Sequence, residues 1–135
     1  MTANPYQDAN AAYQNQAVGT ANPAQLVLML YDRALAGIAR AEHLMASPGA
    51  DAIDVIHSEL TRAQEIVTEL SLSLDHERGG VIAGNLEAIY DFCLARLAEA
   101  NVRKSPTLLP AVSQSLAGLR TAFADAAAKV AAGAA

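Results

Sequence analysis

Apolar residues recur at intervals of three and four along most of this chain, a spacing that predicts amphipathic helices. Four segments carry the pattern, and short breaks that are polar or contain glycine or proline separate them. These segments are residues 23–46, 51–74, 81–100 and the stretch from about residue 106 onwards. Four amphipathic helices with short connections predict an all-α fold, an antiparallel up-down-up-down four-helix bundle.

The first predicted helix has the sharpest start. Asn22 is a favourable N-cap residue, Pro23 suits the first helical position, and Gln25 completes a variant of the capping box. The following run, residues 26–31, is apolar on every side, so more than one face of this helix must be covered. We therefore expect it to be the central helix of the bundle. Gly37 lies inside it at a cost in helix propensity, which a close helix crossing would explain.

The predicted core stripes follow directly from the spacing. In the first helix the stripe is Val27, Leu30, Ala34, Ile38, Ala41 and Met45. In the second helix it is Ile53, Ile56, Leu60, Ala63, Val67, Leu70 and Leu74. In the third helix it is Ile82, Leu86, Ile89, Cys93, Leu97 and Ala100. In the last helix it is Leu109, Val112, Leu116, Leu119, Phe123, Ala126 and Val130.

The breaks between helices carry their own signals. Gly79 and Gly80 close a polar stretch and permit a left-handed turn before the third helix. Asn101 is expected to end that helix in a left-handed conformation. Pro110 comes late for the first turn of a helix, so the regular part of the last helix is expected to begin near it.

The segment before the first helix differs from the rest of the chain. Residues 1–21 hold one charged side chain, Asp8, and few large apolar ones, among them Tyr13 and Val18. Alone, such a segment cannot bury enough surface to offset its ordering entropy. Two interpretations stay open: a disordered tail, or an arm that docks Tyr13 and Val18 into a groove and leaves when a partner arrives. The domain prediction is an arm over 1–21, a bundle over 22–132 and a frayed tail over 133–135.

Composition and charge narrow the function classes. A chain of 135 residues is one domain, and much of its 53% hydrophobic content is alanine, which favours closely packed helices. The net charge of −5 argues against non-specific nucleic-acid binding. The single cysteine excludes an internal disulfide and fits a reducing compartment. Because no apolar run reaches transmembrane length and no secretory signal begins the chain, we expect a cytoplasmic protein without membrane insertion.

Candidate catalytic chemistry is sparse. His43, His57 and His76 have no partner histidine at helical spacing, and no Glu-x-x-His pair of a di-iron bundle occurs. Cys93 falls on the core stripe, which indicates an inert thiol. The Gly79-Gly80 pair lacks the Gly-Lys-Ser of a phosphate-binding loop. We therefore expect no metal, no cofactor and no enzymatic activity.

Four blocks of the chain carry longer motifs. The first comprises Tyr13-Gln14, Val18, Thr20-Ala21-Asn22-Pro23, Gln25-Leu26 and Leu28-Met29-Leu30-Tyr31-Asp32. The second is Arg62-Ala63-Gln64-Glu65-Ile66-Val67-Thr68-Glu69-Leu70, and the third is Leu74-Asp75-His76-Glu77-Arg78-Gly79-Gly80 with Asn85-Leu86. The fourth is Tyr90-Asp91-Phe92, Arg96-Leu97 and Ala100-Asn101. In this order, the four blocks resemble the flagellar secretion chaperone family, FliS. The chain departs from the family pattern at Arg33, where a glycine is common, at Phe123, where tryptophan is common, and at Pro110.

The resemblance implies a cytosolic export chaperone without ATPase activity. Such a protein binds the disordered C-terminal segment of flagellin, prevents its premature polymerisation and presents it to the flagellar type III export gate, the FlhA component. In the family the N-terminal arm covers part of the flagellin site in the free state. The residues expected in the arm and groove are Tyr13, Val18, Leu26, Met29, Leu30, Tyr90 and Leu97.

Two other classes stay open from the residues alone. One is a structural or adaptor bundle that self-associates, for example as a weak homodimer, through its alanine-rich last helix. The other is a metal or cofactor bundle enzyme, which the lack of paired His and Glu ligands disfavours.

Overall fold

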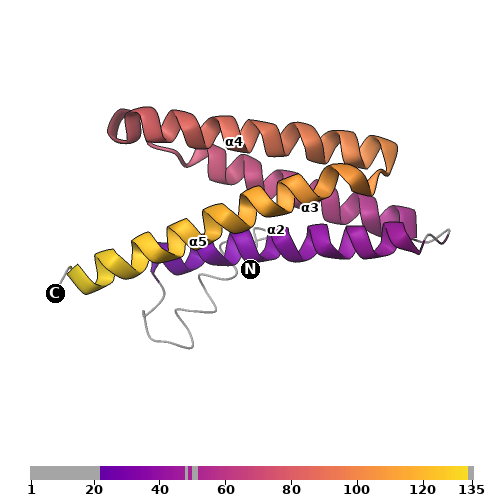
Figure 1. The fold of residues 1–135 in the computed structure, drawn as a ribbon, viewed down its shortest axis with the longest axis horizontal. Helices are drawn as coiled ribbons and strands as arrows, with labels where there is room; N and C mark the ends of the chain where they lie inside the picture. The colour runs from indigo at the N-terminus through magenta and orange to yellow at the C-terminus, as the bar shows by residue number, and fades with distance from the viewer. Residues whose placement is uncertain (1–21, 48, 50–51, 134–135) are drawn as a thin grey trace, which may run out of the picture.

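A computed structural model describes residues 22–47, 49 and 52–133 of the chain. Its elements are α2 (Pro23–Ala46), α3 (Ala52–Leu72), α4 (His76–Arg103), the short 3-10 helix η1 (Pro106–Leu108) and α5 (Leu109–Gly133). Successive helices run in opposite directions, α3 packs between α2 and α4, and α5 closes the bundle by contacting both α2 and α4 (Figure 1). The predicted antiparallel four-helix bundle is confirmed. The predicted arm over 1–21 lies outside the described residues.

Helix α2 begins and ends at the predicted residues. The backbone N–H of Gln25 donates to Asn22 Oδ1 at 2.8 Å, and the backbone N–H of Asn22 donates to Gln25 Oε1 at 3.2 Å. This reciprocal pair is the capping box that the sequence predicts, with Pro23 in the first turn. It fixes where the chain enters the bundle.

The core contains most of the predicted stripe positions. Its fully enclosed large side chains are Ile38, Leu60, Ile66, Val67, Cys93, Leu97, Leu109, Val112 and Leu116. The prediction of burial is wrong for four stripe residues: Ile53, Ile82 and Val130 are 55%, 70% and 69% exposed, and Ala126 is exposed as well. Ile53 lies in the first turn of α3, and the other three line surface grooves beside α5.

The connection from α3 to α4 turns at Gly80. Helix α3 ends at Leu72, two residues earlier than predicted, and a single turn follows whose start is capped by Asp75 Oδ1, 3.2 Å from the Arg78 backbone N–H. Gly80 then has φ 49° and ψ −121°, and the main part of α4 continues beyond this kink. The left-handed turn predicted for the glycine pair is therefore confirmed at Gly80.

The end of α4 differs from the prediction. The left-handed residue is Lys104, with φ 51° and ψ 42°, and Asn101 stays helical. The side chain of Asn101 contacts the His57 ring at Nδ1, 2.9 Å away on α3, and Lys104 Nζ donates to the Asn101 carbonyl at 2.6 Å. These contacts hold Asn101 within the helix and move its end three residues onward. Helix α5 starts at Leu109, directly before Pro110, as expected.

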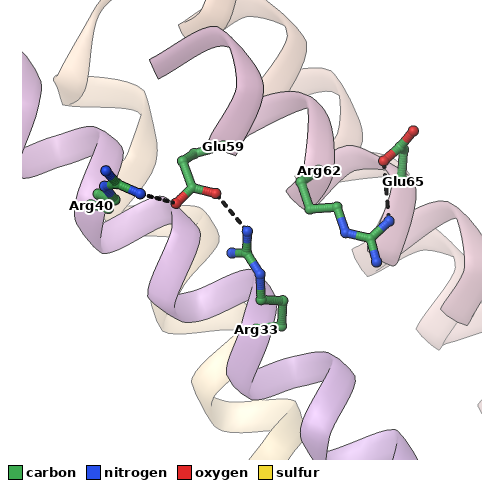
Figure 2. Close-up of polar contacts among 5 residues, drawn as sticks. All are labelled: Arg33, Arg40, Glu59, Arg62 and Glu65. Carbon is green, nitrogen blue, oxygen red and sulfur yellow. Dashed lines mark hydrogen bonds and ion pairs between the residues drawn. The ribbon is translucent and has the colours of Figure 1, made fainter. Parts of the chain in front are cut away.

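A charged cluster joins α2 to α3 beside Gly37 (Figure 2). Glu59 accepts from Arg33 at 2.7 Å through Oε1 and pairs with Arg40 at 3.5 Å through Oε2. A Cβ on Gly37 would lie 2.9 Å from Arg33 Nη1 and 3.4 Å from Glu59 Oε1. The close crossing expected at Gly37 is confirmed, and Arg33, which departs from the family pattern, has a defined partner here.

Candidate functional site

Helix α5 is buried along its first half and uncovered along its second half. Leu109, Val112 and Leu116 are fully buried, whereas Phe123 is half-buried and Ala126 is exposed. Figure 1 shows the cause, since α5 and α4 diverge toward the C-terminal end of α5. The second half of α5 is therefore less covered by the other helices than the first half.

A first space beside this half lies between α2 and α5, and we call it the α2–α5 groove. It has a volume of about 540 Å³. Its α2 wall is the capped first turn with Leu28, and its α5 wall contains Phe123, Ala126 and Val130. The chain enters the bundle at its edge, because Asn22 also lines it.

The second space, the α4–α5 groove, lies on the other side of α5 and has a volume of about 460 Å³. Ile82 and Leu86 of α4 face Leu119 and Phe123 of α5 across it. Phe123 and Ala126 border both grooves, so the second half of α5 is a ridge between them. An amphipathic helix docks in apolar grooves of this kind.

Two tyrosines meet where the α4–α5 groove reaches the core. The hydroxyls of Tyr31 and Tyr90 are 2.7 Å apart and hydrogen-bonded, and both residues line the groove. Burial raises the pKa of both, and at Tyr31 the hydrogen bond with Tyr90 raises it further. Both hydroxyls are therefore neutral at physiological pH and can donate a proton in a hydrogen bond.

An ion pair marks the point where α5 leaves the core. Arg120 pairs with Asp32 of α2 through two contacts, Nε to Oδ1 and Nη2 to Oδ2, the second at 3.1 Å. This hydrogen bonding and the carboxylate charge raise the pKa of Arg120. The pair ties α5 to α2 between the buried Leu116 and the groove residue Phe123.

Other reactive groups are placed away from the grooves. Cys93 is fully buried, and burial raises the pKa of its thiol to about 11, so it stays protonated at neutral pH. Within the part of the chain that the structure describes, no three His, Cys, Asp or Glu side chains come together as metal ligands would. Across the same residues, every helix is too short or too polar to cross a bilayer.

The residues predicted for the site fall into three groups. Tyr13 and Val18 lie outside the described residues. Tyr90 lines the α4–α5 groove, while Leu26 and Leu30 are buried on α2 and Leu97 is fully buried in the core. Met29 is half-buried and belongs to neither groove.

The sequence interpretation missed most of the groove walls. It assigned Ile82, Leu86, Phe123, Ala126 and Val130 to the core stripes, and it placed Leu28 on a second apolar stripe of the first helix together with Tyr31 and Leu35. A signal was present in the last helix, where Ala126 and Ala127 leave space that larger residues of a closed core would fill.

The fold and the grooves define the class of the protein: a helical bundle that offers apolar surface grooves suited to a partner helix. Family models match residues 5–130 to the family described as Flagellar protein FliS. The chain belongs to the FliS family of flagellar secretion chaperones.

Curated relatives agree with this assignment over most of their length. The flagellar secretion chaperone FliS of Bacillus subtilis (strain 168) is 32% identical over 123 residues, which cover 91% of this chain and 86% of that protein. The FliSB chaperone of Pseudomonas aeruginosa is 33% identical over 106 residues, 78% of this chain and 82% of that protein. The FliS chaperone of Salmonella typhimurium (strain LT2) is 36% identical over 110 residues, 79% and 78% of the two chains.

Proposed function

We propose that this protein is a cytoplasmic export chaperone that binds the disordered C-terminal segment of flagellin. Binding prevents premature polymerisation, and the complex is delivered to the flagellar type III export apparatus through its FlhA component. The family assignment supports the chaperone role, since the relatives are named flagellar secretion chaperones. The observation that carries the binding mode is the pair of apolar grooves around the second half of α5.

The physical chemistry of flagellin suits such grooves. A segment that packs by an apolar face in a filament is prone to aggregate when it is free. Docking that face into a groove as a helix removes it from water. Ordering the segment costs part of the gross binding energy, so a large contact can still be released at the export gate. No nucleotide hydrolysis is required for this cycle.

The proposed contact surface extends the residues predicted from the sequence. Phe123, Ala126 and Val130 would touch the bound helix directly, together with Tyr90. Leu26, Leu30 and Leu97 would support the groove walls from the core side, because they are buried and line neither groove, whereas the buried Tyr90 lines the α4–α5 groove. Tyr13 and Val18 remain the predicted anchors of an arm that shares this surface and yields it to flagellin.

The test is calorimetric titration with the C-terminal segment of flagellin from the same organism. We expect one-to-one binding, a negative heat-capacity change, and a gain of helical circular dichroism by the peptide. Ala126→Glu should weaken binding at least tenfold, because a carboxylate would be desolvated between the grooves. Ala128→Glu is the matched control, since Ala128 is an exposed alanine of the same helix and lines neither groove. Equal affinities of the two variants would contradict the proposed surface.

A second candidate is self-association through the same helix. The exposed Val130 and the small side chains of α5 would also suit the α5 helix of a second copy, giving a weak homodimer. Sedimentation velocity over a hundredfold range of concentration distinguishes the two. A mass that rises with concentration and is unaffected by the flagellin segment would favour self-association.

A further inference from the structure

The hydroxyl pair of Tyr31 and Tyr90 contains one more proton than its hydrogen bond uses. Each neutral hydroxyl carries one proton, and the 2.7 Å contact consumes one of the two. Among the described residues neither hydroxyl has another hydrogen-bond partner. The two tyrosines are 3% and 4% exposed, and both line the α4–α5 groove. Counting only residues 22–47, 49 and 52–133, the groove therefore contains a buried donor without an acceptor.

The neighbouring polar groups of the groove do not use this proton. Ser73 Oγ donates to the Leu70 carbonyl at 2.7 Å, and the Asp75 carboxylate accepts from the Arg78 backbone. The remaining walls are apolar, with Ile82, Leu86 and Leu119 among them. A partner that expels solvent from this groove must therefore supply an acceptor or leave the donor unsatisfied, which is costly in a buried place.

We infer that the Tyr31–Tyr90 pair selects a partner helix that carries one small polar side chain on its otherwise apolar face. The inference rests on the proposed function and names a specificity determinant within it. Most backbone carbonyls of a bound helix are engaged in its own hydrogen bonds, so we expect the acceptor to be a side chain. A carboxylate would be desolvated in the apolar groove, which leaves the oxygens of Ser, Thr, Asn or Gln.

The test is a double-mutant cycle between chaperone and peptide. Two forms of the chaperone are compared, the wild type and a double variant that carries Tyr31→Phe and Tyr90→Phe. Each is titrated with the flagellin C-terminal segment, either unmodified or with one polar residue replaced by an apolar residue of similar shape: Ser→Ala, Thr→Val, Asn→Leu or Gln→Met. Replacing both hydroxyls together leaves no orphaned partner, so the double variant is expected to fold, and thermal unfolding checks this. Polar peptide residues outside the contact serve as internal controls.

At one peptide position, the replacement should weaken binding to the wild-type chaperone about tenfold. The same replacement should weaken binding to the double phenylalanine variant less than twofold. This coupling would identify the acceptor. If every replacement changes the affinity of both chaperones by the same factor, the inference is overturned while the chaperone function stands. If the unmodified segment binds neither chaperone, the proposed function fails, and the inference fails with it.

Discussion

The bundle has a closed half and an open half, and the same apolar periodicity leads to a buried core in the first and to exposed side chains in the second. In the closed half, Cys93 and Leu97 of α4 face a core that also encloses Val112 and Leu116 of α5. The open half contains the two grooves. There the apolar stripes of α4 and α5 continue with the same spacing, yet Ile82 and Val130 are mostly exposed. The difference arises because α4 and α5 diverge (Figure 1). A three-four spacing therefore identifies the apolar face of a helix without stating whether another helix covers it.

The comparison also separates stability from binding. Burial in the closed half supplies the free energy that holds the helices together. The open half leaves apolar surface in water, which costs solubility but creates a place for a partner. A bundle built this way can lose or gain a ligand at one end while the other end remains folded.

The largest effect should come from removing a closed-half side chain. Leu116→Ala empties a fully buried site, and we expect the free energy of unfolding to fall by about 2–5 kcal/mol. Val130→Ala, on the open half of the same helix, should change it by less than about 0.5 kcal/mol. Urea unfolding followed by circular dichroism measures both. Comparable losses in the two variants would show that the open half is packed as tightly as the closed half.

A second, intermediate effect concerns pH. The Cys93 thiol has its pKa raised by burial from 9.0 to about 11, so the fold favours the protonated form. Its contribution to stability is fully present below pH 9 and is lost as pH rises from 9 toward 11, at about 1.4 kcal/mol per pH unit. Urea unfolding at several pH values should show this slope in the wild type.

Cys93→Ala is the control for that titration. It removes the thiol but keeps Tyr31 and Tyr90, whose raised pKa values add their own loss of stability above pH 10. The variant should therefore fall less steeply between pH 9 and 11 than the wild type. If stability falls with the same slope in the variant and the wild type, the thiol is accessible to solvent. The closed half would then exclude water less completely than the burial of Cys93 indicates.

Sequence reasoning succeeded where the cause of structure is local. The Asn22 cap, the turn at Gly80 and the late start of the last helix near Pro110 each depend on a few adjacent residues. The sequence-based prediction was wrong where contacts between helices determine the structure. Asn101 stays helical because His57 and Lys104 hold its side chain, which no local pattern reveals.

The candidate site shows the same division. Tyr90 was named from the family resemblance, and its side chain borders a groove. Phe123 and Val130 were assigned to the core, because their spacing is indistinguishable from that of Leu116. Their exposure depends on how α5 packs against both α2 and α4, and that arrangement results from packing along the whole bundle.

The smallest effect on stability is expected at the boundary between the halves, where Asp32 pairs with Arg120. Asp32→Asn removes the charge but keeps the shape of the side chain. The pair is exposed to solvent, so global stability should change little, and the change should vanish in 1 M salt. The amides of residues 121–133 should exchange hydrogen faster in the variant, since α5 loses the ion pair that joins it to α2 next to the grooves. The amides of residues 112–117 should be unaffected.

Hydrogen exchange with mass spectrometry resolves these two stretches of α5. Glu65→Gln is a matched control, because it weakens the Arg62–Glu65 pair, a 3.3 Å contact within α3 that links no two helices (Figure 2). It should leave exchange in α5 unchanged. Faster exchange along the whole of α5 in Asp32→Asn would mean that the two halves open together, and the closed half would then depend on the ion pair as well as on burial. Faster exchange confined to residues 121–133 would establish the boundary at Arg120, because local opening reports the stability of each segment separately.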